Sequence, residues 1–413
     1  MKEKFNKFYK KTLEERRQIL KELNMLNEKI SLDEEIGDTM IENYVLNMEI
    51  PLGLAMNFSI NGKEYIIPMA IEEPSVVAAA SNGAKTLGNI ETSMDRKYLI
   101  GQVVLENVED PDAAIKILEE NKNSLMDLAE EHSQSMIKRG GGPKEITFKK
   151  FDQGFVCIYI SVDTCDSMGA NTINTILEAL APLAEDLTNS SALLRILSNH
   201  AIESVVVAET KTPVQNLDKD IEKARQVARR IEAATKYANI DPYRAVTHNK
   251  GVMNGVDAVV LATGNDFRAV EAGVHAYTVR DGQYRSLTSW TFDEENDLLL
   301  GRIEIPMAVA TLGGTISINP IAKWSLQVLS NPDAKELAKI IASVGLVQNF
   351  SALRALVTDG IQKGHMSLHA KTLAKQIGVK EEEMDEFMRS LLKADKVNLS
   401  LAKGILAKMR EED

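Results

Sequence analysis

The chain has 413 residues, of which 44% are hydrophobic and 26% are charged, and its formal net charge is −12. This composition is typical of a soluble globular protein, and the length allows two or three domains with a large core. The acidic balance excludes a general nucleic-acid binder, because neutralising a phosphate backbone requires clustered Lys and Arg.

The N-terminal segment is charged, and apolar residues recur at helical spacing over residues 5–30, which predicts one helix. The segment lacks the apolar centre of a signal peptide, and the chain has no apolar run of transmembrane length, so we expect a cytoplasmic protein. Asn61-Gly62 between two extended stretches predicts a β-hairpin. The apolar run 76–87, which follows Pro74, predicts a buried helix.

Residues 98–209 predict a small unit with its own order of elements. A first strand precedes a long helix over 110–140; two strands and a second helix follow, and a strand in HAIESVVVAET (200–210) closes the unit. The order βαββαβ is that of a ferredoxin-like domain. Different material flanks the unit on both sides, which indicates an insertion into a larger domain.

The larger domain, formed by residues 1–97 and 210–358, is predicted to be helix-rich, and the whole chain belongs to the α+β class. Helices are expected at 218–239, 250–264 and 266–277, with two strands around 293–297. Beyond Gly364 the chain is helical and highly charged, which predicts a small appended helical domain over 359–413.

The familiar cofactor and metal motifs are missing from the sequence. There is no GxGxxG after a strand, no Walker A motif and no CxxC or HExxH set. His365 and His369 would share a helix face, but no carboxylate joins them at metal-ligand spacing, so we expect no metal. Cys157 and Cys165 lie in one apolar, strand-like stretch and are predicted to be buried thiols without a disulfide.

Four polar side chains interrupt apolar or Gly-punctuated sequence, and each has two interpretations. Glu73 could be a desolvated proton donor or a charge that complements a helix N-terminus. Lys250 could stabilise a developing oxyanion or end a solvated helix. Asp266 has the context of an N-cap, and His365 could be an ordinary surface or core histidine. Taken singly, none of them identifies a function.

A fifth feature is the turn SMGANTIN, which places Gly169 at the opening of a helix after a strand. Backbone N–H groups at such a position can hold a phosphate. Many strand-to-helix turns look alike, so this signal alone is weak.

Together these segments carry a resemblance to a known family. Four blocks are similar, in order and spacing, to the signatures of class II (bacterial-type) hydroxymethylglutaryl-CoA reductases: EEPSVVAAAS (72–81), DSMGANTIN (166–174), THNKGVMNGVDAVVLATGNDFRA (247–269) and GHMSLHA (364–370). The resemblance implies reduction of 3-hydroxy-3-methylglutaryl-CoA to mevalonate and CoA by two successive hydride transfers from NADPH or NADH, through a hemithioacetal and an aldehyde. It further implies that 98–209 binds the nicotinamide cofactor, that 359–413 is a mobile flap, and that the protein is a homodimer or higher homo-oligomer with active sites at the subunit interface.

The resemblance also assigns residues. The family's proton donor, oxyanion stabiliser, lysine-orienting acid and thiolate-protonating histidine match Glu73, Lys250, Asp266 and His365. Positions near the bound acyl-CoA match Ser75, Arg244, Asn254 and Asn349. The dinucleotide-contacting turn matches Asp166, Met168, Gly169, Ala170 and Asn171, and Ser133 aligns with the position near the cofactor ribose.

Three positions depart from the family pattern or refine it. Leu46 stands where the family commonly has Gly, and Ser167 stands where Ala is usual. Ser133 replaces the acid found in NADH users, and Lys138 and Arg139 lie nearby. Hydroxyl and cationic partners suit a ribose 2′-phosphate, which favours NADPH.

Two other functions fit the same scaffold: a reductase of a related acyl-CoA, and a non-catalytic protein that binds CoA thioesters. The presence of all four catalytic matches argues against the second, because a degenerate relative would have lost at least one. Mevalonate synthesis and mevalonate catabolism use the same residues, so neither the direction nor the oligomer size follows from the sequence.

Overall fold

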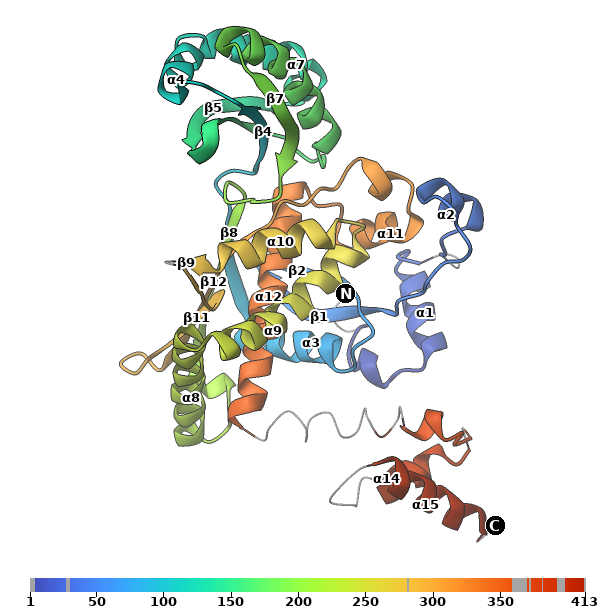
Figure 1. Cartoon of the computed structure of the whole chain (residues 1–413). Coiled ribbons are helices and arrows are strands. Elements are labelled where there is room, and N and C mark those ends of the chain that lie inside the picture. The colour runs from blue at the N-terminus through green and yellow to red at the C-terminus, as the bar shows by residue number, and fades with distance from the viewer. Residues whose placement is uncertain are drawn as a thin grey trace.

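The computed structural model describes residues 4–26, 30–280, 282–358, 370, 373–380, 382–391 and 398–411. Two sheets organise most of it, in two lobes (Figure 1). The larger sheet contains β1 (Leu52–Ile60), β2 (Lys63–Ala70), β3 (Asn89–Ser93), β8 (Val205–Pro213), β11 (Thr288–Asp293) and β12 (Leu298–Pro306). Their order is β11-β12-β8-β3-β1-β2, with β1 and β3 parallel and the other neighbours antiparallel. A short ribbon of β9 (Val279–Arg280) and β10 (Gln283–Tyr284) stands apart.

The hairpin predicted at Asn61-Gly62 is confirmed, because these two residues alone connect β1 to β2. Both have positive φ, 49° and 77°. Two consecutive left-handed residues match the twist of the flanking strands, and Asn and Gly adopt that conformation most readily.

Helices pack against the larger sheet and enclose the main core. They are α3 (Val76–Leu87), α8 (Ile221–Ile240), α9 (Pro242–Ala262), α10 (Phe267–Tyr277), α11 (Pro320–Val328) and α12 (Ala334–Val357). By length and composition α12 could cross a membrane, but 72% of its apolar window is buried inside the fold. Its apolar character is therefore explained by its place in the core.

Close packing of α9 against α12 depends on two glycines. A Cβ on Gly255 would lie 3.0 Å from Cγ1 of Val344, and a Cβ on Gly345 would lie 3.0 Å from Cγ2 of Val256. Contacts this short are tighter than van der Waals packing allows, so larger residues would push the helices apart. The two glycines thus set the separation of the helices that carry Lys250 and Asn349.

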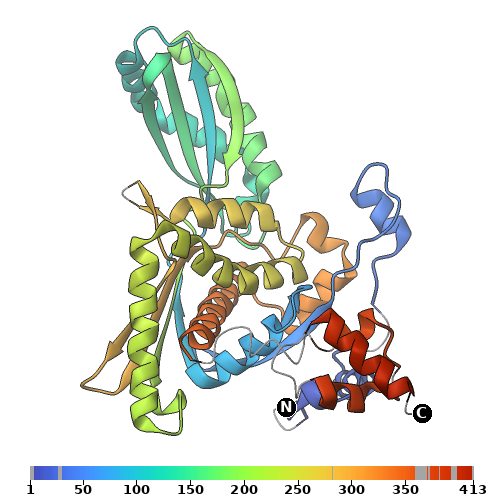
Figure 2. The ribbon, with the colours of Figure 1, turned by 60° about the horizontal axis from the view of Figure 1, so that its bottom comes forward.

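The smaller sheet contains β4 (Tyr98–Glu106), β5 (Gly142–Phe151), β6 (Phe155–Asp163) and β7 (Ser191–Ser198). The order is β5-β6-β4-β7, and all neighbours are antiparallel. Helices α4 (Pro111–Glu120), α5 (Lys122–Glu131) and α7 (Ala170–Thr188) cover one face and share a separate core with it (Figure 2).

The prediction that residues 200–210 close this smaller sheet is wrong. Its fourth strand is β7, whereas β8 lies between β3 and β12 in the larger sheet. The physical reason is residue type: β7 (SALLRILS) is rich in Leu, which helices favour as well as strands. β8 begins with three consecutive β-branched valines, which favour a strand more strongly.

Two predicted long helices are divided in the structure. The helix predicted over 5–30 consists of η1 (Phe8–Lys10) and α1 (Leu13–Glu22), because Thr12 starts a new helix with a capping box. The helix predicted over 110–140 consists of α4, α5 and α6 (Gln134–Ile137), which break at Asn121 and Ser133. Apolar periodicity continues across such breaks and does not reveal them.

The remaining helices and strands predicted between residues 76 and 306 are confirmed, with α9 beginning eight residues earlier than expected, at Pro242 rather than 250. Of the helical segment predicted beyond Gly364, residues 364–369, 371–372, 381, 392–397 and 412–413 lie outside the described residues. The other helices are α2 (Glu34–Met40), α14 (Met384–Leu391), α15 (Leu399–Glu411), η2 (Asp152–Gly154), η3 (Val214–Asn216) and η4 (Gly314–Ser317). Residues of the C-terminal segment, including Phe387 and Leu391, form a third, small core.

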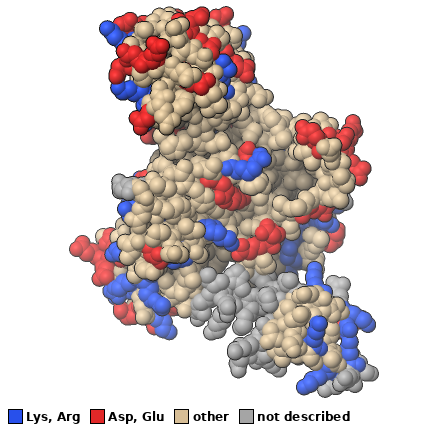
Figure 3. All heavy atoms as spheres, in the orientation of Figure 1, with Lys and Arg blue, Asp and Glu red and all other residues tan. Residues whose placement is uncertain are grey.

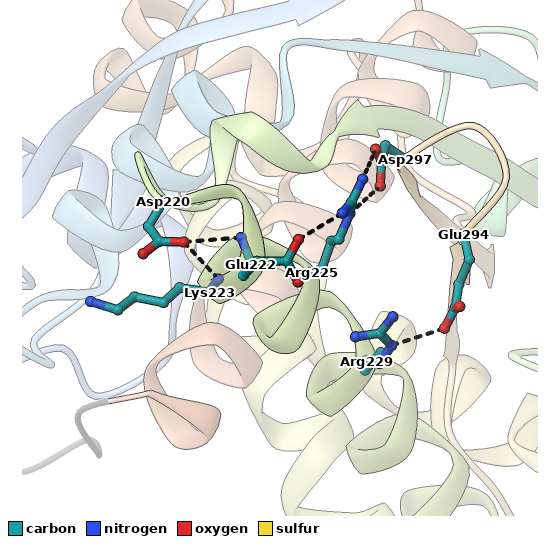
Figure 4. Close-up of polar contacts among 7 residues, drawn as sticks. All are labelled: Asp220, Glu222, Lys223, Arg225, Arg229, Glu294 and Asp297. Atoms are coloured by element: carbon teal, nitrogen blue, oxygen red, sulfur yellow. Dashed lines mark hydrogen bonds and ion pairs between the residues drawn. The ribbon is translucent and has the colours of Figure 1, made fainter.

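A group of ion pairs fixes α8 to the turn between β11 and β12 (Figure 4). Asp220 caps α8, Arg225 binds both carboxylate oxygens of Asp297 at 2.8 and 2.7 Å, and Arg229 binds Glu294 at 2.9 Å. Exposed pairs add little stability, but a bidentate guanidinium–carboxylate pair constrains orientation. These contacts hold β11 in place, and β11 supports the site described next.

Candidate active site

Glu73 and Lys250 meet although they are 177 positions apart in the chain. Glu73 lies in the loop between β2 and α3, and Lys250 projects from α9. Lys250 Nζ donates to Glu73 Oε2 at 2.7 Å, and Asn254 Nδ2, one helical turn further along α9, donates to the same oxygen at 3.5 Å. The Lys250 side chain is 60% exposed and the Glu73 side chain is 39% exposed, so a ligand can reach the pair.

The loop that carries Glu73 ends in a strained residue. Ser75 precedes α3 with φ 78° and ψ −19°, a left-handed conformation that a residue with a side chain adopts only at an energetic cost. Such conformations persist where the surrounding structure enforces them, and they are common at functional sites. The strained turn fixes the direction from which Glu73 approaches α9.

Asp266 is the N-cap of α10, as its sequence context predicted. Its Oδ1 accepts from the N–H groups of Arg268 and Ala269 at 3.0 and 3.2 Å, and the Arg268 side chain binds both carboxylate oxygens. Burial opposes ionisation, but the Arg268 hydrogen bond and these N–H groups outweigh it and lower the pKa of Asp266. Within the described residues Asp266 forms no hydrogen bond with Lys250.

The loop before Asp266 is connected to the SMGANTIN turn. Asn265 exchanges two hydrogen bonds with the backbone of Ala310, at 3.0 and 2.8 Å. Two residues further along, Leu312 pairs with Ser167 in an isolated β-bridge. The structure therefore brings the loop before Asp266 and the expected cofactor turn to the same junction between the two sheets.

The turn itself has the features of an anion site. Gly169 is the N-cap of the 19-residue helix α7, with φ 71°, and no side chain among the described residues caps its first N–H groups. A Cβ on Gly169 would collide with Thr164. Met168 and Ala170 are half-buried beside it, and Asn171 is exposed. Unsatisfied N–H groups at a helix N-terminus favour a bound phosphate.

Asp166 links this turn to α12. Its Oδ1 accepts from the N–H of Ala334, the first residue of α12, at 2.8 Å. Its carbonyl oxygen accepts from the N–H groups of Thr311 and Leu312 at 2.9 and 3.0 Å. Asp166 is thus a link between the turn and the larger domain.

Lys97 was not identified from the sequence, because a Lys beside a strand looks like a surface residue. Its side chain is buried, and Nζ donates to Thr164 Oγ1 at 2.8 Å. Burial lowers the pKa of Lys97 to about 8, although Asp163 and Asp166 oppose that shift. The residue places a cationic group beneath the turn.

Ser133 and Cys165 differ from what the sequence suggested. Ser133 is buried, and its hydroxyl donates to the carbonyl of Ala129 at 2.8 Å, so it does not face outward in this structure. Lys138 and Arg139 nearby are exposed. Both cysteines are free, and Cys157 is buried as expected. Cys165 is wrongly predicted as a buried strand residue, because β6 ends at Asp163 and Cys165 lies half-buried in a turn with φ 51°.

The expected acyl-CoA contacts lie in different environments. Arg244 on α9 is half-buried, and this burial lowers its pKa. Asn349 on α12 is only 1% exposed and hydrogen bonds to His248, Thr288 and Trp290. Leu46 is 70% exposed. His365 lies outside the described residues.

A half-buried carboxyl pair joins Asp257 on α9 to Glu271 on α10. Burial and the neighbouring Glu271 raise the pKa of Asp257 to about 8, and Asp257 Oδ1 has no partner among the described residues. His275, whose Nε2 is 2.6 Å from Glu271, lowers the pKa of Glu271. Asp257 is therefore the protonated member of the pair at neutral pH.

This pair predicts a pH-dependent stability. In the unfolded chain Asp257 ionises near pH 4, so between about pH 4 and about pH 8 the folded state holds a proton that the unfolded state has lost. Stability then falls as pH rises through this window. Asp257→Asn removes this pH dependence of stability, because the amide does not ionise. At about pH 8 the thermal unfolding midpoint of the variant should exceed that of the unmodified protein, and at about pH 5 the difference between the two midpoints should be smaller. A gap independent of pH would contradict this assignment.

The described residues contain no cluster of three or more His, Cys, Asp or Glu side chains that could hold a metal ion. On the face shown in Figure 3, acidic and basic side chains are interspersed and form no continuous basic stripe. The polar groups available for chemistry are the exposed Lys250–Glu73 pair and, separately, the N-terminus of α7, which is suited to a phosphate.

Comparisons with known proteins identify relatives over almost the full chain. The sequence profile described as "Hydroxymethylglutaryl-coenzyme A reductase" matches residues 12–370. The chain is 41% identical to 3-hydroxy-3-methylglutaryl-coenzyme A reductase of Archaeoglobus fulgidus, covering 98% of this chain and 94% of that protein. It is 34% identical to the probable enzyme of Borreliella burgdorferi, covering 98% and 96%.

Solved structures of reductases are also similar to this chain over nearly its full length. The reductase of Streptococcus pneumoniae superposes with a TM-score of 0.84 at 41% identity, covering 98% of this chain and 99% of that one. A class II structure from the same organism, bound to NADPH in open conformations, superposes with a TM-score of 0.83, covering 97% and 100%.

Proposed function

The chain belongs to the hydroxymethylglutaryl-coenzyme A reductase family, and on this premise we propose that the Glu73–Lys250 pair is the reacting centre of the enzyme. The protein is an oxidoreductase that reduces 3-hydroxy-3-methylglutaryl-CoA to mevalonate and CoA with NAD(P)H. The class II resemblance of the sequence is thereby confirmed. The observation that supports the reacting centre is the 2.7 Å contact between Lys250 Nζ and Glu73 Oε2.

Lys250 acts as the electrostatic stabiliser. Each reduction step places negative charge on the oxygen of a thioester or aldehyde carbonyl, and an ammonium held at that point lowers the energy of the transition state. Lys250 is well placed for this role because Glu73 fixes one of its N–H groups and leaves two for a ligand oxygen.

Glu73 supplies the proton that the oxygen needs. Its Oε2 is held by Lys250 and Asn254, so the carboxyl group stays directed at α9. A proton donor within hydrogen-bond reach of the reacting oxygen accelerates such a step by about 10²–10⁴-fold.

Asp266 and His365 complete the proposed catalytic set. For Asp266 to orient Lys250, its carboxylate must exchange its Arg268 partner for the lysine. His365, on the proposed flap domain 359–413, protonates the departing CoA thiolate. Acyl-CoA contacts are proposed for Ser75, Arg244, Asn254 and Asn349.

The nicotinamide cofactor is proposed to bind on the domain built from β4–β7 and α4–α7, and NADPH is preferred. When bound, it supplies the hydride for each reduction. The N-terminus of α7 fits a phosphate group, and Gly169 allows the turn its positive φ and its close contact with Thr164. Met168, Ala170 and Asn171 border this position, Asp166 fixes the turn, and Lys138 and Arg139 supply exposed cations for a 2′-phosphate. Ser133 contributes only if its hydroxyl is released from Ala129.

We also propose a cytoplasmic homodimer or higher homo-oligomer. Apolar side chains with high exposure between α2 and β1 support an interface there: Val45, Leu46 and Met48 are 84%, 70% and 84% exposed. Sedimentation equilibrium measures the mass directly, and a strict monomer at micromolar concentration would contradict the proposal.

The function is tested by following absorbance at 340 nm with purified protein, 3-hydroxy-3-methylglutaryl-CoA and either NADPH or NADH. The expected result is two cofactors oxidised for each CoA released, faster with NADPH, with mevalonate as the product. Oxidation only with another acyl-CoA would favour a related reductase, and binding without oxidation would favour a CoA-thioester binding protein.

A further inference from the structure

His248 and Asn349 meet in the core, 101 positions apart in sequence. His248 lies on α9 two residues before Lys250 and is 2% exposed. Its Nε2 is 2.9 Å from Asn349 Nδ2 and 2.6 Å from Thr288 Oγ1. No step of the proposed reaction uses this histidine.

The orientation of the Asn349 carboxamide follows from Trp290. The indole Nε1–H can only donate, and it lies 2.9 Å from one terminal atom of Asn349, which must therefore be Oδ1. Thr288 Oγ1 lies 2.9 Å from the same oxygen. The other terminal atom, 2.9 Å from His248 Nε2, is then the NH2 group.

This orientation determines the tautomer of His248. The Asn349 NH2 can only donate, so His248 Nε2 must be an unprotonated acceptor, and the ring proton is on Nδ1. Burial and the nearby Arg244 lower the pKa of His248 to about 3, which keeps the ring neutral. His248 Nδ1 has no hydrogen-bond partner in the described part of the chain.

An unpartnered buried N–H is unfavourable, so an apolar side chain would serve packing better at this position. The presence of a histidine here is thus explained by the hydrogen bond that its Nε2 accepts from Asn349. Thr288 has a single hydroxyl proton, which it can give to Asn349 Oδ1 or to His248 Nε2 but not to both. Asn349 uses Oδ1 to accept from Trp290 and one N–H to donate to His248, and its second N–H has no acceptor among the described residues.

We propose that His248 is a positioning residue that fixes Asn349 as a hydrogen-bond donor toward an oxygen of the bound acyl-CoA. The inference rests on the proposed role of Asn349 as a substrate contact. Without the acceptor at Nε2 the amide loses its fixed orientation, and an oxygen facing the substrate oxygen would repel it.

Two substitutions separate this role from packing. In His248→Gln the terminal amide replaces Nε2 and can still accept from Asn349, whereas in His248→Asn the amide reaches only the position of Nδ1. We expect KM for 3-hydroxy-3-methylglutaryl-CoA to rise about tenfold in His248→Asn and to stay within about twofold in His248→Gln. KM for NADPH should be unchanged in both. The matched control His200→Asn, at an exposed loop position, should have unmodified kinetics.

Thermal unfolding of both variants shows whether stability explains the difference; similar midpoints with unequal KM values support the proposal. Equal KM values in the two variants would overturn it. If His248→Asn does not fold, ¹⁵N NMR of the unmodified, histidine-labelled protein still decides: His248 should carry its proton on Nδ1 and not titrate between about pH 5 and pH 9. A protonated Nε2 would overturn the inference, whereas an unmodified protein without reductase activity would instead contradict the proposed function.

Discussion

Lys250→Ala is expected to lower kcat by about 10²–10³-fold while the protein remains folded. The lysine is the cation nearest to Glu73, at 2.7 Å, and its removal leaves the developing oxyanion without its stabiliser. The fold should tolerate the change, because the Lys250 side chain is 60% exposed and exposed ion pairs contribute little to stability. The 340 nm assay and a thermal unfolding curve on the same preparation measure the two effects.

Lys236→Ala provides the matched control. Lys236 pairs with Glu232 on α8 at 2.9 Å and is 74% exposed, so it loses a similar ion pair far from the proposed chemistry. Its activity should equal that of the unmodified protein. If Lys250→Ala kept more than about a tenth of the activity, Lys250 could not be the oxyanion stabiliser.

Glu73→Gln is expected to lower kcat by about 10²–10⁴-fold, because an amide of the same size cannot deliver a proton to the reacting oxygen. The side chain can still accept from Lys250, so the position of the lysine should be preserved. Reduction of the aldehyde, supplied directly, should fail as well, since both reductions develop charge on the same oxygen. Steady-state rates with the thioester and with the aldehyde measure this.

Glu72→Gln tests the adjacent carboxylate, which is exposed and makes no described contact with Lys250. It should retain normal kinetics with both substrates. Normal aldehyde reduction by Glu73→Gln would show that another group protonates the second intermediate.

Local structure was predictable wherever neighbouring residues decide it. The Asn61-Gly62 hairpin and the helix after Pro74 follow from turn chemistry and apolar spacing, and both are present. The βαββαβ order was also correct as a pattern, but its last strand was misassigned. Strand pairing is decided by partners distant in the chain, and the Leu-rich β7 is less distinct from a helix than β8, which begins with three valines.

The sequence by itself determined the family and the residue types that we propose to carry the chemistry. The blocks around Glu73 and Lys250 are contiguous, and their side-chain types follow directly from the chain. Contiguous motifs of this kind can be identified from the sequence without knowledge of the fold.

Only the tertiary structure decided which of these groups meet and how each is charged. It joins Glu73 to Lys250 across 177 positions, but pairs Asp266 with Arg268 instead of the lysine. It also buries His248 as a neutral acceptor for Asn349. Hydrogen-bond partners and desolvation depend on packing between segments that are distant in the chain. The spacing of those segments in the sequence does not predict which of them come into contact.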